Sequence, residues 1–211
     1  MGVKIEKMKH ELFTWVSARI VSHLWIGAVR GLENVDVAGP SIVIANHSSY
    51  LDFLILGSLF EHHLDRRLHF FAKDKVFEHR LFRFYCRQFE CLLVKNGHVS
   101  LDTWKLAIQR LRGGHMIGIF PEGTRSRTGD LLPFESGYLR LAQQARVPVL
   151  PITLTGTYRI WPPHQRLPKR IKSDIQVHAP FFLPEKVKKG ELLEINQTIR
   201  NRYFRPLLCA V

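Results

Sequence analysis

The sequence predicts a single α/β domain in which a mainly parallel, mixed β-sheet is flanked by helices. Short apolar runs, typical of buried strands, alternate along the chain with segments whose apolar residues recur at helical spacing. The chain has 211 residues, which fits one ordinary domain, and its 45% hydrophobic residues are enough to bury a core. In a sheet of this kind we expect the functional site at the carboxyl ends of the strands.

The first expected element is an amphipathic helix within residues 1–30, ahead of the main body of the domain in residues 31–211. Its apolar residues recur every three to four positions and are Leu12, Trp15, Val16, Ile20, Leu24 and Trp25. The basic residues around them are Lys4, Lys7, Lys9 and Arg30. Basic ends and bulky aromatics suit a helix in a membrane interface, but packing on the domain core fits the pattern equally well. Arg19 and His23 interrupt the apolar stretch, so no bilayer-spanning helix is expected.

Strands and helices are then expected in turn along residues 31–211. The apolar runs that predict strands are residues 41–45, 68–72, 91–95, 115–120, 147–155 and 175–178. The segments with helical spacing are residues 49–60, 100–113, 136–146 and 191–203. Ser100 is a good N-cap for the second of these helices. Residues 161–172 are Pro-rich and basic, and we expect them to form a surface loop.

The charge balance limits the class of partner. The chain has 31 Lys and Arg against 18 Asp and Glu, a formal net charge of +13. The expected partner is therefore anionic: a nucleic acid, an anionic membrane or a phosphorylated substrate. Cys86, Cys91 and Cys209 lack metal-ligand spacing, so no metal site is expected. Their odd number, with no signal peptide, favours a reducing compartment such as the cytoplasm.

The best local candidate for catalysis is residues 46–52, Asn-His-Ser-Ser-Tyr-Leu-Asp. His47 stands at the end of a predicted strand and Asp52 in the first turn of the next helix. A carboxylate that accepts a hydrogen bond from one imidazole nitrogen leaves the other nitrogen as a base toward a hydroxyl group. Two structural alternatives remain open. Asp52 could cap the helix opposite Ser49, and His47 could be a buried turn residue.

A second His–Asp pair has the same separation in the sequence. His69 and Asp74 bracket a predicted strand, in which positions five apart point to opposite faces of the sheet. We therefore expect these two side chains not to touch.

A further motif, Phe-Pro-Glu-Gly-Thr-Arg-Ser, occupies residues 120–126 and directly follows a predicted strand. Backbone N–H groups around a glycine, a threonine hydroxyl and a guanidinium together make a compact receptor for phosphate oxygens. The alternative is a polar turn with a solvated arginine.

Together these motifs resemble those of the glycerophospholipid acyltransferases, whose best-known members are the 1-acylglycerol-3-phosphate acyltransferases. Residues 46–52 match the family's His-four-residues-Asp signature, and residues 120–126 match its Phe-Pro-Glu-Gly-Thr-Arg-Ser block. Residues 71–73 resemble its Phe-Ala-Lys segment, and residues 147–156 resemble its last block. The resemblance spans about half the chain. One departure is Lys95, where the family usually has arginine, and this leaves the identity of the acceptor open.

The resemblance implies an O-acyltransferase of phospholipid biosynthesis. It would move a fatty acyl group from acyl-CoA or acyl carrier protein to the free hydroxyl of a lysophospholipid, most readily 1-acylglycerol-3-phosphate, which gives phosphatidic acid. His47 would be the general base, and Asp52 would orient it. The residues that would hold or surround the acceptor are Lys73, Lys95, Glu122, Gly123, Thr124 and Arg125. For Glu122, binding of acceptor hydroxyls and bracing of its loop both remain open.

No cofactor is expected beyond the acyl-CoA or acyl carrier protein that serves as the acyl-donor substrate. The expected location is cytoplasmic, with peripheral attachment to an anionic membrane surface. The alternative within the same class is an acyltransferase that acts on another lysolipid or on an amino-acid-linked lipid. A hydrolase that uses the same pair to activate water or Ser48 is a further alternative. A basic nucleic-acid-binding module is disfavoured because the sequence has no recognised binding motif, so no nucleic-acid partner is expected.

Overall fold

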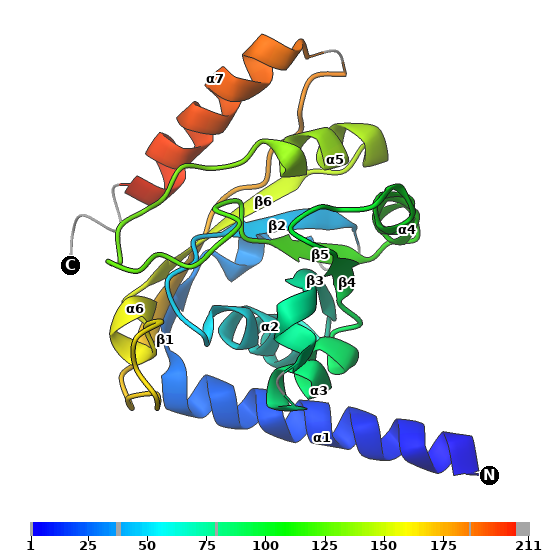
Figure 1. The fold of residues 1–211 in the computed structure, drawn as a ribbon, viewed down its shortest axis with the longest axis vertical. Coiled ribbons are helices and arrows are strands. Elements are labelled where there is room, and N and C mark those ends of the chain that lie inside the picture. Colours follow the sequence, from blue (N-terminus) through cyan, green and yellow to red (C-terminus); the bar gives the residue numbers. More distant parts are fainter. Residues whose placement is uncertain (1, 37–38, 79, 186, 206–211) are drawn as a thin grey trace.

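Seven strands form one sheet in the order β1-β7-β6-β2-β5-β3-β4 (Figure 1). The computed structural model describes residues 2–36, 39–78, 80–185 and 187–205, and the side chains of residues 2–13, 81 and 189 fall outside this description. The strands are β1 (Ile26–Arg30), β2 (Ser41–Ala45), β3 (Leu68–Lys73), β4 (Leu92–Val94), β5 (Met116–Ile119), β6 (Val149–Thr155) and β7 (Ser173–Val177). Only the β6–β7 pair among these is antiparallel. The mainly parallel α/β fold predicted from the sequence is thus confirmed.

Helices cover both faces of this sheet (Figure 1). They are α1 (Gly2–Trp25), α2 (Asp52–His63), α3 (Arg80–Gln88), α4 (Leu101–Arg112), α5 (Gly137–Ala145), α6 (Thr157–Ile160) and α7 (Lys189–Ile199). Figure 1 shows α1, α2 and α3 on one side of the sheet and α4, α5 and α7 on the other. Each predicted helix after the first is present, and Ser100 caps α4 by accepting a hydrogen bond from the Thr103 backbone N–H.

The buried residues form one core on each face of the sheet. In β2, Val43 and Ala45 pack into the core beneath α2, whereas Ile42 and Ile44 pack into the core beneath α4 and α5. Because alternate residues of a strand point to opposite faces, a strand covered on both sides must be apolar throughout. This requirement explains why the run at residues 41–45 was readable from the sequence.

The N-terminal helix is shorter than predicted. It ends at Trp25, and residues 26–30 form the edge strand β1, which pairs in parallel with β7. The expectation of helix across residues 1–30 was therefore wrong at its end. Asp174 of β7 receives the Ala28 backbone N–H, and a Cβ on Gly27 would lie only 2.4 Å from the same carboxylate oxygen. This long-range pairing decides the structure of the segment.

Helix α1 packs one side on the domain and exposes another. Thr14, Ala18 and Val21 are buried, and α1 lies against α2. Trp15 and Ile20 remain 48% and 53% exposed. The two alternatives left open by the sequence are thus compatible, since the helix contacts the core and still presents bulky apolar residues to its surroundings. Among the described residues, no helix has both the length and the apolarity needed to cross a membrane.

A glycine in the middle of the sheet makes room for an aromatic ring. A Cβ on Gly118 of β5 would lie 2.5 Å from the ring of Phe70 of β3. Phe70 is itself buried and stacks at 6.1 Å on Phe120, at the carboxyl edge of the sheet. Any side chain at position 118 must therefore displace a buried ring that supports this edge.

Substitution of this glycine is expected to destabilise the fold. Gly118→Ala should lower the free energy of unfolding by about 1–3 kcal/mol, because the added methyl group overpacks the Phe70 ring. The matched control is Gly137→Ala at the start of α5, where a Cβ meets nothing within 4 Å and stability should be unchanged or slightly higher. Chemical denaturation of the three proteins measures this difference, and equal midpoints for all three would contradict the expectation.

Candidate active site

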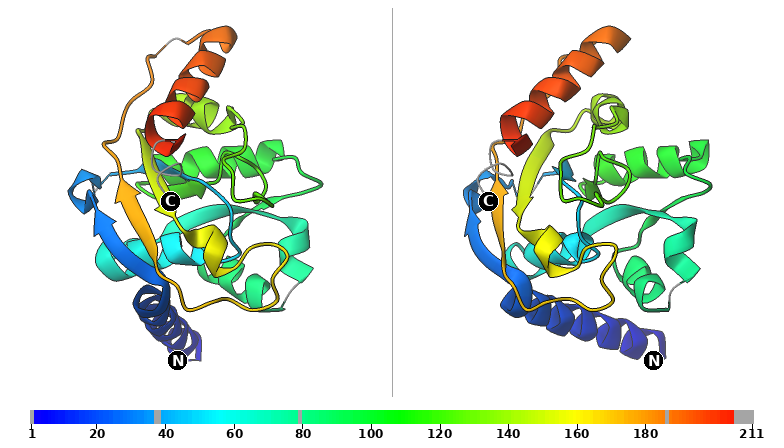
Figure 2. Two further views of the ribbon diagram at one scale, coloured as in Figure 1. Left: turned by 90° about the vertical axis from the view of Figure 1, so that its left-hand side faces the viewer. Right: turned by 60° about the vertical axis from the view of Figure 1, so that its left-hand side comes forward.

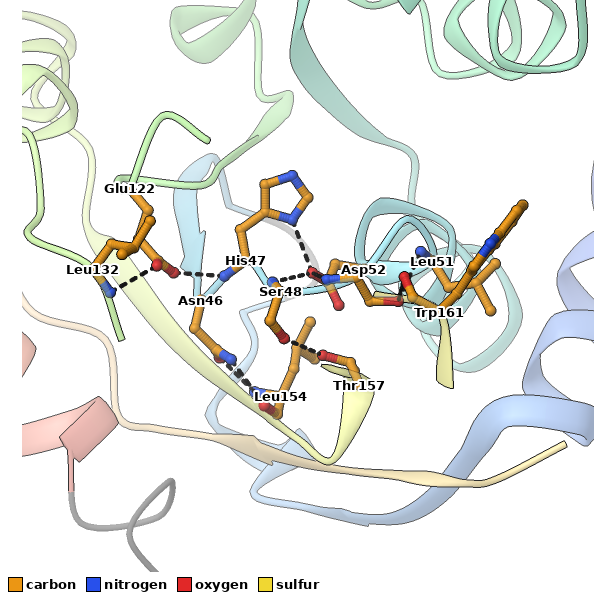
Figure 3. Close-up of polar contacts among 11 residues, drawn as sticks. Asn46, His47, Ser48, Leu51, Asp52, Glu122, Leu132, Leu154, Thr157 and Trp161 are labelled. Carbon is orange, nitrogen blue, oxygen red and sulfur yellow. Dashed lines mark hydrogen bonds and ion pairs between the residues drawn. The ribbon is translucent and has the colours of Figure 1, made fainter. Parts of the chain in front are cut away.

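His47 and Asp52 meet at the carboxyl end of β2, where the chain turns into α2. The His47 Nδ1 atom lies 2.8 Å from Asp52 Oδ2 (Figure 3). Asp52 is fully buried, whereas the His47 side chain is 18% exposed. Because the carboxylate can only accept, Nδ1 carries the proton and Nε2 is left as the basic nitrogen. Figure 3 shows the far side of the imidazole directed away from Asp52.

Asp52 also fixes the turn that precedes its helix. The same Oδ2 atom accepts hydrogen bonds from the Ser48 and Ser49 backbone N–H groups, each at 2.7 Å. Asp52 is the first residue of α2, where the helix dipole favours a negative charge. One carboxylate therefore both fixes this turn and contacts His47. Its other oxygen, Oδ1, is buried and has no hydrogen-bond partner among the described residues.

An aromatic wall supports the imidazole from behind. The Phe120 ring stacks on His47 with 4.1 Å between ring centroids and an interplanar angle of 16°. The Phe70 ring in turn stacks on Phe120. The orientation of His47 is thus fixed by Asp52 at one nitrogen and by Phe120 against the ring.

Asn46 joins the end of β2 to β6, a contact that the sequence analysis missed. Its Nδ2 donates to the Leu154 carbonyl oxygen at 2.9 Å, and its Oδ1 accepts from the Leu154 N–H at 2.8 Å (Figure 3). The side-chain amide thereby replaces a peptide unit in the sheet ladder. The available signal was an asparagine directly before the histidine, but nothing local indicated a partner 108 residues away.

Glu122 braces His47 through the backbone. Its Oε1 accepts from the His47 N–H at 2.6 Å, and its Oε2 accepts from the Leu132 N–H at 2.9 Å. The Ser126 N–H donates to the His47 carbonyl oxygen at 2.8 Å, so both backbone groups of His47 are tied to the loop at 120–132. Glu122 is only 7% exposed. Of the two roles left open by the sequence, this geometry supports bracing, and binding of acceptor hydroxyls stays a prediction.

The protonation state of Glu122 is balanced near neutrality. Burial raises the pKa of the Glu122 carboxyl to about 7, against the opposing effect of the hydrogen bonds from the His47 and Leu132 N–H groups. The negative charge of Asp52 raises this pKa further, and the positive charge of Arg200 lowers it.

Arg200 holds the other side of the same loop, and sequence reasoning missed it too. Its Nε donates to the Leu132 carbonyl oxygen at 3.0 Å, and an Nη donates to the Leu131 carbonyl oxygen at 2.7 Å. Arg200 begins a π-helical turn, Arg200–Phe204, that follows α7. A chain of contacts therefore runs from this turn through Leu132 and Glu122 to His47.

Arg125 lies on the ring of Tyr50. The guanidinium carbon is 3.7 Å from the centre of the Tyr50 ring, which places a cation on an aromatic face. Such stacking uses the face of the guanidinium and leaves its in-plane N–H donors for a carboxylate or phosphate. Gly123 has a φ of +65° and is exposed together with Thr124. The expected phosphate-binding residues 123–125 thus stand on the loop that is tied to His47.

Lys73 and Lys95 stand at the same edge of the sheet but farther along it. Lys73 is the last residue of β3, Lys95 directly follows β4, and both side chains are exposed. The parts of the chain that the structure describes record no direct contact between either lysine and His47, Asp52 or Arg125. Their contribution at this edge is positive charge.

The serines beside His47 point elsewhere. Ser48 Oγ lies 3.0 Å from Thr157 Oγ1 (Figure 3). Ser49 Oγ donates to the Trp161 carbonyl oxygen at 3.1 Å. Neither hydroxyl is engaged by the imidazole, so the geometry disfavours a serine nucleophile activated by His47.

The second His–Asp pair does not form. His69 is buried and its Nδ1 lies 3.0 Å from the Phe89 carbonyl oxygen, whereas Asp74 accepts hydrogen bonds from the Lys75 and Asn96 N–H groups. Burial, with the charge of Arg110 as the next cause, lowers the pKa of His69 to about 4. The prediction that this pair would not touch is confirmed.

Nor do the described residues hold a group of three or more His, Cys, Asp or Glu side chains placed for a metal ion.

Several known proteins are similar to this chain. A 1-acyl-sn-glycerol-3-phosphate acyltransferase from Saccharomyces cerevisiae is 28% identical over 204 residues, which cover 92% of this chain and 66% of that protein. A chloroplastic 1-acyl-sn-glycerol-3-phosphate acyltransferase from Brassica napus is 32% identical over 137 residues, or 64% of this chain and 38% of that protein. The chain thus spans less than half the length of the Brassica relative.

A solved structure shares the fold. The crystal structure of the 1-acyl-sn-glycerophosphate acyltransferase PlsC from Thermotoga maritima superposes with a TM-score of 0.71 and 26% sequence identity. The superposition covers 92% of this chain and 76% of that one. The family-level comparison agrees with it, because the sequence model of the acyltransferase family matches residues 27–155. That match takes in well over half the chain, including His47, Asp52 and the loop that carries Glu122 and Arg125, and the chain therefore belongs to the acyltransferase family.

Proposed function

We propose that this protein transfers a fatty acyl group from an acyl thioester to the free hydroxyl of a lysophospholipid, with 1-acylglycerol-3-phosphate as the acceptor. The observation that carries this proposal is the 2.8 Å contact between His47 Nδ1 and the buried Asp52 carboxylate, which leaves Nε2 available as a base. The names of the relatives described above support the acceptor. The donor is either acyl-CoA or an acyl carrier protein, and turnover measured with each would identify it.

The proposed reaction needs one base and one oriented acceptor. His47 Nε2 removes the acceptor's hydroxyl proton as the oxygen attacks the thioester carbonyl carbon, and Asp52 stabilises the imidazolium that forms. The tetrahedral intermediate then expels the thiolate, which takes the proton from His47. An ester bond forms, a thioester bond breaks, and the enzyme returns to its starting protonation state. No covalent enzyme intermediate is required, in agreement with the orientation of Ser48 and Ser49.

Arg125 is the proposed anchor for the acceptor phosphate. Its guanidinium is positioned by the Tyr50 ring, and the neighbouring residues 123 and 124 present an exposed backbone and a hydroxyl. Lys73 and Lys95 add positive charge at the same edge of the sheet. A panel of lysolipids, including acceptors with an amino-acid-linked headgroup, would test whether Lys95 shifts the acceptor preference away from 1-acylglycerol-3-phosphate.

Peripheral attachment to an anionic membrane is part of the proposal. It is supported by the net charge of +13 and by the exposed Trp15, Val16 and Ile20 of α1. Bulky apolar residues beside basic ones are typical of helices that lie in the interface between headgroups and acyl chains. Binding of the intact chain to vesicles that contain phosphatidylglycerol tests this part, and failure to bind them would refute it.

The His47–Asp52 pair is expected to account for most of the rate. His47→Ala and Asp52→Asn should each lower kcat by about a thousandfold or more, because the first removes the base and the second loses the charge that orients it. The control is His62→Ala at the other end of α2, which should keep normal turnover. Thioester consumption with and without acceptor measures these rates. Normal turnover in either site variant, or consumption that does not need the acceptor, would contradict the proposal.

Loss of Arg125 should mainly weaken acceptor binding. Arg125→Ala is expected to raise KM for 1-acylglycerol-3-phosphate by about 10–100-fold with a smaller change in kcat, since a charged hydrogen bond to phosphate is removed. Arg127→Ala, an exposed neighbour on the same loop, is the matched control. Steady-state kinetics over a range of acceptor concentrations measures both constants, and an unchanged KM in Arg125→Ala would refute this role.

Glu122 should give the activity a pH dependence near neutrality. As the pH falls through about 7, the carboxyl takes up a proton and one of its two oxygens becomes a poor acceptor, so either His47 or Leu132 loses a backbone hydrogen bond. Turnover should therefore fall on the acid side. Glu122→Gln should show turnover about tenfold lower at all pH values and should lack the Glu122 step. Glu135→Gln, an exposed residue nearby, should behave as the unmodified protein.

Stability should respond to the same group with the opposite sign. The folded-state pKa of about 7 lies above the ordinary value of 4.5, so the contribution of Glu122 to folding is fully present below about pH 4.5 and is lost as the pH rises through 7. Relative to the unmodified protein, Glu122→Gln should thus become progressively more stable between about pH 5 and pH 8. Chemical denaturation across this range measures the difference, and a constant difference would show that Glu122 does not titrate as described.

A further inference from the structure

The loop between α6 and β7 is a basic surface with an apolar tip. Leu167 is 75% exposed, and the exposed cations around it are Arg166, Lys169, Arg170 and Lys172. The sequence has no acidic residue between Glu135 and Asp174, so no carboxylate within this stretch offsets their charge. A single exposed leucine is ordinary on a protein surface. An exposed leucine on a loop that carries four exposed cations has the chemistry that suits an anionic bilayer surface.

Hydrogen bonds hold this loop in shape. The Lys169 N–H donates to the Ile160 carbonyl oxygen at 2.8 Å, which closes the base of the loop. Within it, Trp161 Nε1 donates to the Gln165 carbonyl oxygen at 3.0 Å, and the Gln165 side-chain amide donates to the Leu167 carbonyl oxygen. These hydrogen bonds therefore hold Leu167 in its exposed position. Its exposure is a feature of the fold.

The base of the loop contacts the turn between β2 and α2, which carries His47. The Trp161 carbonyl oxygen accepts from the Tyr50 N–H at 3.0 Å and from Ser49 Oγ. The Trp161 and Tyr50 rings lie 5.2 Å apart, and the Tyr50 ring also carries the Arg125 guanidinium. Contacts through Trp161 and Tyr50 thus connect this loop to Arg125, the residue proposed to hold the acceptor.

The loop also adjoins the helix that exposes its own apolar residues. Trp25 Nε1, at the end of α1, donates to the Lys169 carbonyl oxygen at 2.9 Å. Figure 1 shows α6 and the loop after it beside this end of α1, and both views in Figure 2 show the same arrangement. Trp15, Val16 and Ile20 of α1 are therefore carried on an element that is tied to the loop.

We propose that residues 164–172 form a second membrane-contacting element, with Leu167 inserted among the lipids and the surrounding cations on anionic headgroups. The loop thereby holds the His47 corner against the bilayer from which the acceptor lipid is drawn, and this last step rests on the function proposed above. The occupant is a bilayer that contains anionic phospholipid. The exposed leucine among the cations of this loop favours a bilayer over an acidic protein or a nucleic acid.

Two loop variants test the proposal by co-sedimentation with phosphatidylcholine–phosphatidylglycerol vesicles. The triple change Arg166→Gln, Lys169→Gln and Arg170→Gln should weaken binding about fivefold for each charge, on the order of a hundredfold in all. Leu167→Asp should weaken it about tenfold or more. Vesicles of phosphatidylcholine alone should show little binding by any variant, and added salt should reduce the effect of the triple change.

Matched controls separate this surface from net charge and from general exposure. Leu193→Asp changes a leucine on α7 that is 57% exposed. A second triple variant removes the same charge from exposed positions on or next to α4 and α5, and its changes are Lys105→Gln, Arg140→Gln and Arg146→Gln. Both controls should bind the vesicles nearly as the unmodified protein does. Equal losses in the control triple and the loop triple, or unchanged binding in both loop variants, would overturn the proposal.

A parallel assay keeps this proposal distinct from the proposed reaction. With acceptor dispersed in detergent and no vesicles, both loop variants should transfer the acyl group at the rate of the unmodified protein. Absence of transfer in every protein, including the unmodified one, would refute the reaction while leaving the vesicle result to decide the membrane contact. Loss of binding to duplex DNA but not to vesicles in the loop variants would assign the surface to a polyanion and refute the bilayer.

Discussion

One carboxylate oxygen holds the active-site corner together. Oδ2 of Asp52 accepts the His47 imidazole and two backbone N–H groups, all within 2.8 Å. The two backbone bonds fix the turn between β2 and α2, and the third bond fixes the ring that the turn carries. Because the oxygen is fully buried, water does not compete for it. The shape of the turn and the tautomer of the base therefore depend on the same ionised group.

A second buried carboxylate holds the corner from the opposite side. Glu122 takes the His47 N–H, and Ser126 returns a bond to the His47 carbonyl group, so the loop and the strand end are joined at one residue. Burial raises the pKa of Glu122, and repulsion from the nearby Asp52 carboxylate raises it further. Arg200 partly offsets this repulsion from a turn near the C-terminal end of the described chain. The arrangement thus relates an element outside the family-matched residues 27–155 to the histidine within them.

The local sequence pattern was sufficient to predict the strands that helices cover on both faces of the sheet. Strand β2 is covered on both faces and is apolar from Ile42 to Ala45, and the strand-end histidine and the helix-start aspartate are only five positions apart. Pattern failed where distant partners decide the outcome. Residues 26–30 continue the apolar spacing of α1, but pairing with β7 makes them a strand. Helix α3 was also not predicted, although its three arginines recur at helical spacing. The contacts of Asn46, Glu122 and Arg200 join residues 108, 75 and 68 positions apart, and no spacing rule reaches that far.

The stacking of Phe120 on His47 has an electrostatic consequence. While the His47 imidazole is neutral, its contact with Phe120 at 4.1 Å is packing between two flat rings. Once the imidazole has taken the acceptor's proton, the same aromatic face lies against a full positive charge, an attraction of about 0.5–1 kcal/mol at ordinary sites. The Phe120 ring, which holds His47 in place, therefore also stabilises the imidazolium while the tetrahedral intermediate is present.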